Sequence, residues 1–404
     1  MLRAPAEPAA PESHGQRWAF ALLLILTGLA MGVSGMPSPL YGVYEQTWDL
    51  SPFATTVVFA VYACAALGAV LVSGRISDAV GRKPVLLAAL LALIVGLVLF
   101  LLADDIVLLL VARIIHGAAV GSIVVAASAA LLDLRPEHGM RSGQLSGISF
   151  NIGLMVAVLI TAAFAQYAPH PLRTPYAVIA VVCAIVGVGV LGLRETHTTR
   201  AGGPVRIAKP AVPSVIRRDF WFAALGAMAS WSVFGVLMSL FPALAAQQAR
   251  VDNLLFGGGV VGTVALAAAV TQWSTTRMPA HRAAIVGDVG LAVTLLVAIP
   301  AMALQSWPAV FVTAALLGST FGLAFGGSLR HLSHVVPRGQ RGETMSAFYV
   351  LAYLAMTVPT LMAGWASTRW SLTAAFPWFA ALNALVCLAA AALGVVTMRK
   401  QASR

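Results

Sequence analysis

The chain has few charged residues and almost no cysteine. Only 10% of its 404 residues are Asp, Glu, Lys or Arg, whereas a soluble domain has about 25%. Its three cysteines, Cys64, Cys183 and Cys387, lie within apolar runs, which excludes a disulfide framework between loops. The sequence also has no Walker-type phosphate loop, no His-Glu-x-x-His and no paired Cys/His spacing. We therefore expect no enzyme, no metal site and no cofactor.

Apolar residues make up 60% of the chain. A hydrocarbon core about 30 Å thick takes about 20 residues per helical span, and an open chain satisfies its backbone in lipid only as helix. We therefore predict an all-α membrane protein in contact with the lipid bilayer, with twelve transmembrane helices. The predicted spans cover residues 18–43, 53–74, 84–103, 106–132, 142–166, 175–194, 219–245, 254–274, 283–303, 307–330, 344–366 and 371–397.

The basic residues alternate between the two sets of loops. Of the 25 Lys and Arg residues, 21 lie in the tails or after even-numbered spans. The exceptions are Arg113, Arg173, Arg250 and Arg369. Because cytoplasmic loops are enriched in Lys and Arg, we predict that both termini are cytoplasmic. The abundance of Ala, Gly and Arg indicates a bacterial source, hence a multi-pass inner-membrane protein. The net charge of +11 is then a property of the inner face, and no nucleic-acid partner is expected.

A basic stretch that contains Pro and Gly divides the predicted spans six and six. An equal division predicts two six-helix bundles related by a repeat. Glycines spaced by four occur at corresponding places in spans four and ten, where they predict close helix packing: Gly117, Gly121, Gly318 and Gly322. The predicted segments are a cytoplasmic tail 1–17, a first bundle 18–194, a cytoplasmic linker 195–218, a second bundle 219–397 and a cytoplasmic tail 398–404.

The strongest local pattern follows the second span, where residues 74–83 read G-R-I-S-D-A-V-G-R-K. The second glycine permits a tight turn. The aspartate is suited to accept hydrogen bonds from a helix N-terminus, and the arginine is suited to pair with Asp133 or Glu137 in the next basic loop. The residues of this pattern are Gly74, Asp78, Gly81, Arg82 and Lys83.

This loop resembles the G-x-x-x-D-x-x-G-R-[RK] signature of the major facilitator superfamily, and it lies between the same two spans. The resemblance extends over the chain through the span number and the six-plus-six division. It implies that the loop is a conformational latch, which holds the halves together at the start of span eleven, near residues 342–344. The alternative is a topological turn with stop-transfer charges.

A second pattern lies in span four, where residues 113–121 read R-I-I-H-G-A-A-V-G. It resembles the R-x-x-x-G-x-x-x-G pattern of proton-coupled members, among them twelve-helix drug:proton antiporters. Arg113 would lie about 10 Å inside the span. An arginine at that depth lines a cavity or pairs with another group, so we expect a role in proton coupling or substrate binding, or else a helix–helix strut. His116 is either a protonation site or a packed neutral histidine.

Span five lacks the Gly-Pro pair of the drug antiporters, because it reads G-I-S-F-N-I-G from Gly147 to Gly153. Asn151 is then either a pocket-lining residue or an interhelical hydrogen-bonding group. Asp288 is the one carboxylate inside an apparent span. It is a candidate for proton coupling, or else an interfacial charge paired with Arg282 or His281. The sequence leaves the proton carrier unassigned.

Aromatic and Met side chains in the inner helices are candidates to line a cavity that accepts an amphipathic or weakly charged compound. We predict a monomeric secondary transporter that works by alternating access and exports a small organic or drug-like substrate in exchange for protons. The alternatives are a proton-coupled importer, a metabolite exporter, or a transporter-like membrane sensor or lipid-handling protein. The candidate lining residues are Met31, Tyr41, Tyr62, Trp231, Phe234, Met238, Tyr349 and Tyr353.

Overall fold

The computed structural model describes residues 14–135, 139–197, 210–337 and 340–402, and this part of the chain contains helices and no strand. The helices of the first half are α1 (His14–Gly35), η1 (Ser38–Leu40), α2 (Tyr41–Trp48), α3 (Pro52–Val80), α4 (Arg82–Leu102), α5 (Ile106–Leu134), α6 (Gly139–Tyr167) and α7 (Thr174–Leu191). Those of the second half are η3 (Ser214–Ile216), α8 (Arg217–Ser239), α9 (Phe241–Ala249), α10 (Leu254–Ser274), α11 (Ala280–Ala303), α12 (Trp307–Val335), α13 (Arg341–Arg369) and α14 (Leu372–Ala402).

Twelve segments of the described chain are long and apolar enough to cross a membrane, which confirms the predicted number and the all-α class. Large apolar side chains such as Leu91, Val188 and Leu385 are more than 60% exposed on the outer surface. An exposed apolar belt of this kind suits a lipid surround, because exposed apolar side chains are more favourable in contact with lipid than in contact with water.

The first and seventh spans are interrupted, where the sequence predicted continuous segments 18–43 and 219–245. In the first half, α1 ends at Gly35 and the chain resumes as η1 and α2 after Pro37. In the second half, α8 ends at Ser239 and α9 begins next to Pro242. Proline lacks a backbone N–H and its ring clashes with the preceding turn, so each break follows from a proline at the same depth.

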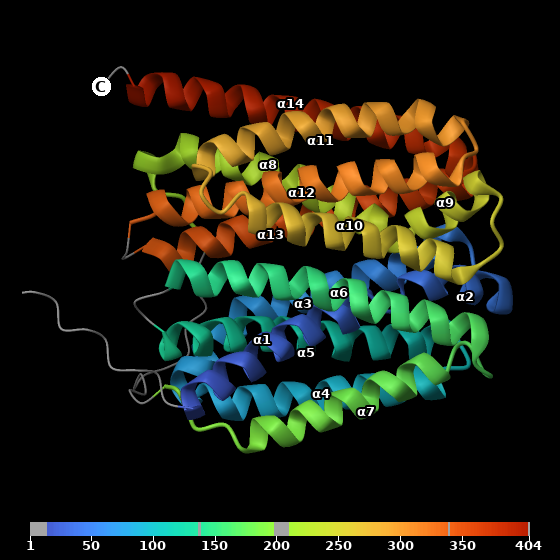
Figure 1. Cartoon of the computed structure of the whole chain (residues 1–404), viewed down its shortest axis with the longest axis horizontal. Coiled ribbons are helices and arrows are strands. Elements are labelled where there is room, and N and C mark those ends of the chain that lie inside the picture. The colour runs from blue at the N-terminus through green and yellow to red at the C-terminus, as the bar shows by residue number, and fades with distance from the viewer. Residues whose placement is uncertain (1–13, 136–138, 198–209, 338–339, 403–404) are drawn as a thin grey trace, which may run out of the picture.

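The two halves have the same internal packing pattern. In the first half α1 packs on α6, α3 and α4 pack on α5, and α4 packs on α7. In the second half α8 packs on α13, α10 and α11 pack on α12, and α11 packs on α14. The halves lie side by side in Figure 1 and meet along two pairs, α6 with α10 and α3 with α13. The fold is therefore two six-helix bundles with a repeated arrangement.

The bundle has two faces, at opposite ends of its helices. The basic face is the end of the helices that carries Arg75, Arg82, Arg277 and Arg341, and the opposite face is the end that carries α2 and α9. Residues 1–13, 136–138, 198–209, 338–339 and 403–404 lie outside the described chain. Most of the predicted N-terminal tail, half of the predicted linker, the end of the C-terminal tail and the candidate partner Glu137 therefore lie outside it.

Glycines bring the backbones of adjacent helices together. A Cβ at Gly117 would overlap the carbonyl oxygen of Tyr62, and one at Gly121 would lie 2.6 Å from that of Ala66, so α5 lies directly on α3. A Cβ at Gly318 would overlap the carbonyl oxygen of Val264, and one at Gly322 would lie 3.0 Å from that of Ala268. These are the close approaches that the four-residue spacing predicted, and they occur on equivalent helix pairs of the two halves.

Candidate functional site

The loop between α3 and α4 forms a charge cluster at the basic face. Helix α3 ends at Val80 because Gly81 has a φ of 106°, a conformation that favours glycine. The Arg82 side chain then turns inward, and only 8% of it is exposed. Its Nη1 lies 2.5 Å from Asp78 Oδ1, its Nε donates to Asp133 Oδ2 at 3.1 Å, and its Nη1 donates to Ser77 Oγ at 2.6 Å. The predicted pairing of Arg82 with Asp133 is therefore present.

A residue that the sequence did not single out completes this cluster. Glu195, just after α7, accepts hydrogen bonds from the backbone N–H groups of Arg82 at 2.9 Å, Lys83 at 3.1 Å and His197 at 3.0 Å. Burial alone would raise the pKa of Glu195, but these backbone donors outweigh it and hold the pKa below its usual value. A Cβ at Gly81 would lie 2.9 Å from Glu195 Cδ, so glycine is needed there for space as well as conformation.

In this structure Glu195, and not Asp78, accepts hydrogen bonds from a helix N-terminus. The first turn of α4 has no side-chain cap of its own, because its N-cap residue is Gly81. The carboxylate of Glu195 satisfies these free N–H groups and faces the positive end of the helix dipole. Asp78 contacts the Arg82 side chain and not a helix N-terminus. Two features of the sequence indicate this contact. An acidic residue follows directly after span six, and span three begins without a capping side chain.

Among the residues that the structure describes, the charge cluster makes no ionic contact with the other half. The ion pair of Asp78 is with Arg82 of its own half, and Arg341, at the start of α13, donates instead to the carbonyl oxygen of Ser333. Lys83 donates to the carbonyl oxygen of Leu191, again within the first half. Gly74 packs against α5, with Val125 Cγ1 3.5 Å from the place of a Cβ. The contact with residues 342–344 that the family resemblance implies is absent from this state of the described chain.

Hydrogen bonds join the halves at both faces. Near the basic face, Gln144 Nε2 on α6 donates to the carbonyl oxygen of Gln272 on α10 at 3.3 Å, and two further bonds lie at the opposite face. The backbone N–H of Phe53 on α3 donates to Thr368 Oγ1 on α13 at 3.1 Å, and the backbone N–H of Leu254 on α10 donates to Gln166 Oε1 on α6 at 2.7 Å. A Cβ at Gly364 would lie 2.6 Å from Thr56 Cγ2, so α13 and α3 touch closely there. The structure is therefore closed at the opposite face.

Arg113 is enclosed by aromatic rings in the first half. Its side chain is 1% exposed, and its guanidinium carbon lies 5.6, 5.1 and 5.9 Å from the ring centres of Tyr41, Tyr62 and Phe100. It donates to the Tyr41 hydroxyl and, at 3.4 Å, to the carbonyl oxygen of Ser34, while its Nε has no partner. No described carboxylate pairs with it. The ring faces therefore supply the negative potential around this buried cation.

Two other polar candidates lie near this region. His116 is 1% exposed, neither ring nitrogen has a hydrogen-bond partner, and its ring lies 5.5 Å from Tyr62 and 5.7 Å from Phe100. It is a packed ring here, with no group placed to stabilise its charged form. Asn151 donates from Nδ2 to the carbonyl oxygen of Gly147 at 2.9 Å within α6. The rest of the Asn151 side chain faces the surface between the halves.

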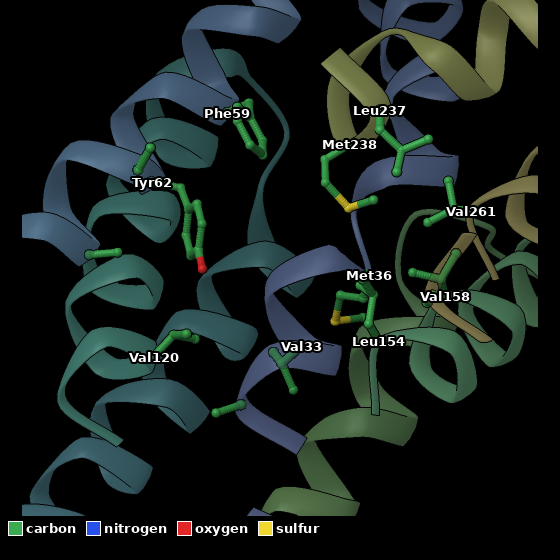
Figure 2. Packing of buried hydrophobic residues seen from close by; sticks show 14 of the residues in the cluster. Val33, Met36, Phe59, Tyr62, Val120, Leu154, Val158, Leu237, Met238 and Val261 are labelled. Carbon is green, nitrogen blue, oxygen red and sulfur yellow. The ribbon is translucent and has the colours of Figure 1, made fainter. Parts of the chain in front are cut away.

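The surface between the halves is apolar and closely packed. A cavity of about 10 Å³, enough for one water, lies there between Asn151 and Leu154 of α6 and Phe234 of α8. Figure 2 shows Met36, Leu154 and Val158 of the first half near Leu237, Met238 and Val261 of the second. The halves must separate before an organic compound can occupy this surface.

The candidate lining residues divide into four groups. Tyr41 and Tyr62 surround Arg113, and in the second half Trp231 lies 4.7 Å from Tyr353 between ring centres. Phe234 lines the small cavity and Met238 is buried beside it. The remaining candidates are only partly buried (Met31) or packed against Phe348 (Tyr349).

Asp288 is not an interfacial charge paired with Arg282 or His281. It is fully buried in α11, and it pairs with neither Arg282 nor His281. The interfacial interpretation is wrong because α11 is covered on this side by α8, α12 and α14. The sequence distance from Arg282 does not reveal the direction in which Asp288 points.

Comparison with known proteins decides the family. The sequence profile described as Major Facilitator Superfamily matches residues 23–358 of the chain. The chain belongs to the Major Facilitator Superfamily. It is therefore a multi-pass membrane transporter and not an enzyme.

Relatives in this superfamily are similar over part of their length. The chain is 27% identical to the multidrug resistance protein MdtL of Klebsiella pneumoniae over 240 residues, 58% of this chain and 59% of that protein. It is 25% identical to the inner membrane transport protein YajR of Escherichia coli over 236 residues, 57% of this chain and 47% of that protein. The chain thus spans about half the length of the curated relatives it matches.

Solved structures match along nearly the whole chain. A bacterial homologue of the human lysosomal transporter Spinster, in an inward-facing and unoccupied conformation, has a TM-score of 0.75 at 14% identity and covers 96% of this chain and 98% of that one. The human organic anion transporter MFSD10 has a TM-score of 0.68 at 16% identity and covers 95% of this chain and 100% of that one. At these identities the likeness concerns the fold alone.

Proposed function

We propose that this transporter exports a small, amphipathic or weakly charged organic compound in exchange for protons. The observation that carries the proposal is the surface between the halves, where Phe234, Leu237, Met238 and Leu154 offer apolar contact and Asn151 one polar group. A surface of this composition favours a compound that buries apolar area over a sugar phosphate or an inorganic anion. The relatives named multidrug resistance protein MdtL support the same substrate class.

The transport cycle is alternating access about the α6/α10 and α3/α13 pairs. This structure is one end state, closed where Phe53 meets Thr368. In the other end state the α3–α4 loop reaches the start of α13, so that Asp78 faces the free N–H groups near Thr344. A carboxylate is stabilised at that position by the helix dipole. The ion pairs of Arg82 need not break for this motion, because Asp78 and Asp133 lie in the same half as Arg82.

The basic face is cytoplasmic in this proposal, with both termini on that side, and the protein is a monomer in a bacterial inner membrane. The loops at the opposite face carry Arg173, Arg250 and Arg369 as their basic residues, and the positive-inside rule places such loops outside. The state described here is then closed toward the outside. The halves would separate at the cytoplasmic side for an exporter to take up its substrate.

Dye accumulation in cells tests the proposal. Cells that produce the wild-type protein are expected to accumulate less ethidium than cells that produce the Arg113→Ala variant, and the difference should vanish when an uncoupler collapses the proton gradient. Arg173→Ala is the matched control, because Arg173 is exposed and pairs with Asp104 at the opposite face. Wild-type cells that accumulate more ethidium than the variant would indicate an importer, and unchanged accumulation with and without uncoupler would contradict proton coupling.

A further inference from the structure

The second half contains a carboxylic acid that no described group serves. Asp288 is fully buried in α11, and neither of its oxygens has a hydrogen-bond partner. A carboxylate buried without a donor or a counter-charge is strongly unfavourable, and the group avoids this state by holding a proton. The surroundings of Asp288 therefore suit the neutral acid.

The neighbours of Asp288 come from three other helices. A Cβ at Gly226 of α8 would lie 2.8 Å from Asp288 Oδ1 and 2.8 Å from Ser328 Oγ of α12, so these two oxygens converge on the same glycine. Ser328 is also fully buried and its hydroxyl has no partner. The buried thiol of Cys387 faces the group from α14. Glycine at 226 is what leaves the carboxyl and the hydroxyl room at this crossing of helices.

A second polar pair connects this site to the basic face. His331 Nε2 lies 2.8 Å from Asp219 Oδ1, and both side chains are largely buried. His331 lies one helical turn beyond Ser328 on α12, and Asp219 lies two turns before Gly226 on α8. Residues three or seven apart share one face of a helix, so the two polar pairs follow each other along the α8/α12 contact.

The helices that pack near Asp288 carry the following charged and titratable groups. Cys387 faces it from α14, and the Asp219–His331 pair lies toward the basic face between α8 and α12. On its own helix, His281 and Arg282 stand in the first turn and leave the carboxyl oxygens of Asp288 without a partner. Helix α9, which also touches α11, contributes no acid, lysine or histidine.

We propose that Asp288 is the proton-binding group of this transporter, that it takes up its proton from the opposite face when the halves are open there, and that the Asp219–His331 pair passes this proton on to the basic face. The inference rests on the proposed proton coupling and names the residue that carries it. In the present state, closed at the opposite face, the close packing of α8, α11 and α12 favours the protonated acid. Loss of the proton requires water or a donor at Asp288, so it favours a state in which the α8/α12 contact opens. Differential proton affinity of the two states is what links the proton to the conformational change.

Infrared spectroscopy tests the proton on Asp288 without a substrate. We expect wild-type protein in liposomes to show, at pH 7, a C=O stretching band of a protonated carboxylic acid that Asp288→Asn lacks. Asp104→Asn, which removes an exposed acid at the opposite face, should keep the band. A band that persists unchanged in Asp288→Asn would overturn the proposal. If Asp288→Asn does not insert, Asp288→Glu should keep the band at a shifted frequency, and an unshifted band would count against Asp288.

A separate measurement tests whether the Asp219–His331 pair passes the proton to the basic face. His331→Gln is expected to keep the band but to slow its hydrogen–deuterium exchange at least fivefold, because the path to the basic face is interrupted. Exchange at the wild-type rate would remove the Asp219–His331 pair from the proposal.

A transport assay separates this inference from the function on which it rests. In proteoliposomes, ethidium accumulation driven by a pH gradient should be at least tenfold lower for Asp288→Asn than for wild type. Ethidium exchange at equal pH should stay within twofold of wild type. Gradient-driven accumulation at the wild-type level in Asp288→Asn would overturn the inference and leave proton-coupled export standing. Wild-type protein that ignores the pH gradient would overturn the proposed function, whatever the infrared spectrum shows.

Discussion

In the first half Arg113 is buried among three aromatic rings, whereas in the second half Asp288 is buried with no polar partner at all. The guanidinium stays charged at any physiological pH, and the rings and the Tyr41 hydroxyl compensate that charge. Asp288 lacks such compensation. The difference indicates a division of labour, in which one half holds a permanent charge and the other half a group that gains and loses a proton.

The loops that connect the second and third helices of each half also differ in their acidic residues. In the first half this loop carries Asp78 and Arg82 and is fixed by Asp133 and Glu195. The corresponding segment of the second half, between α10 and α11, contains Arg277 but no acid. A repeated fold therefore has one loop suited to contact the other half through a carboxylate, and one that is not.

Arg113→Ala tests the permanent charge and has the largest expected effect. We expect ethidium export to fall about 100-fold at every pH, since hydrogen bonds of a buried charge contribute about 1.5–3 kcal/mol and 1.4 kcal/mol is a factor of ten. Export is measured in proteoliposomes between pH 6 and 8, where Asp288→Asn should instead lose its response to pH. Arg113→Lys should restore little, because lysine lacks the planar fork. Export by Arg113→Ala at the wild-type rate would reduce Arg113 to a strut between helices.

Asp78→Asn tests the asymmetry between the loops. Transport is expected to fall about tenfold, as removal of one charge–dipole and ion-pair interaction of about 1–2 kcal/mol would predict. Insertion should be unchanged, because Asp78 is half exposed and its partner Arg82 keeps Asp133. Initial rates of ethidium export and membrane yield are the measurements, with Asp104→Asn as the control. Equal rates in Asp78→Asn and wild type would exclude a role of the loop in the cycle.

Gly153→Ala tests the close contact of α1 and α6, which corresponds to that of α8 and α13. A Cβ at Gly153 would lie 2.6 Å from Gly28 Cα, so the helices must move apart at a cost of about 1–3 kcal/mol. The midpoint temperature of the protein in detergent should fall by several degrees. Gly68→Ala is the matched control, because a Cβ there meets open space. Equal melting of the two variants would contradict the close contact.

Glu195→Gln tests the cap of α4 and has the smallest effect, about 0.5–1 kcal/mol after allowance for solvent screening. The backbone donors depress the pKa of Glu195 in the folded protein. Its stabilisation is therefore complete above the unfolded pKa of about 4.3 and is lost as the pH falls through the lower folded value. The melting difference between wild type and variant should be present at pH 7 and shrink as the pH falls below about 4.

The sequence was sufficient for features that depend on spacing along one helix. Apolar run lengths predicted the twelve spans, four-residue glycine spacing predicted the close approach of α5 to α3, and the loop signature predicted the Arg82–Asp133 pair. Each of these needs only the periodicity of a helix or the charge of an adjacent loop.

Features that depend on how distant helices are rotated were missed. Glu195 caps α4 only because α7 returns the chain to the first turn of α4, more than a hundred residues later in the sequence. The burial of Asp288 depends on α8, α12 and α14, and nothing along α12 alone distinguishes His331 and Ser328 from other isolated polar residues of a span. Depth can be read from one helix, whereas partners come from the packing of several.

Paired distances at the two faces test the central claim, that the halves alternate under control of a proton. Spin labels at residues 53 and 368 report the opposite face and labels at 75 and 341 the basic face, in a Cys64→Ser background because Cys64 is exposed. At pH 5 we expect the 53–368 distance to be short and the 75–341 distance to be long. At pH 8 the first should lengthen and the second shorten, and Asp288→Asn should abolish the shift. Two distances that stay constant, or that change in the same direction, would contradict the account.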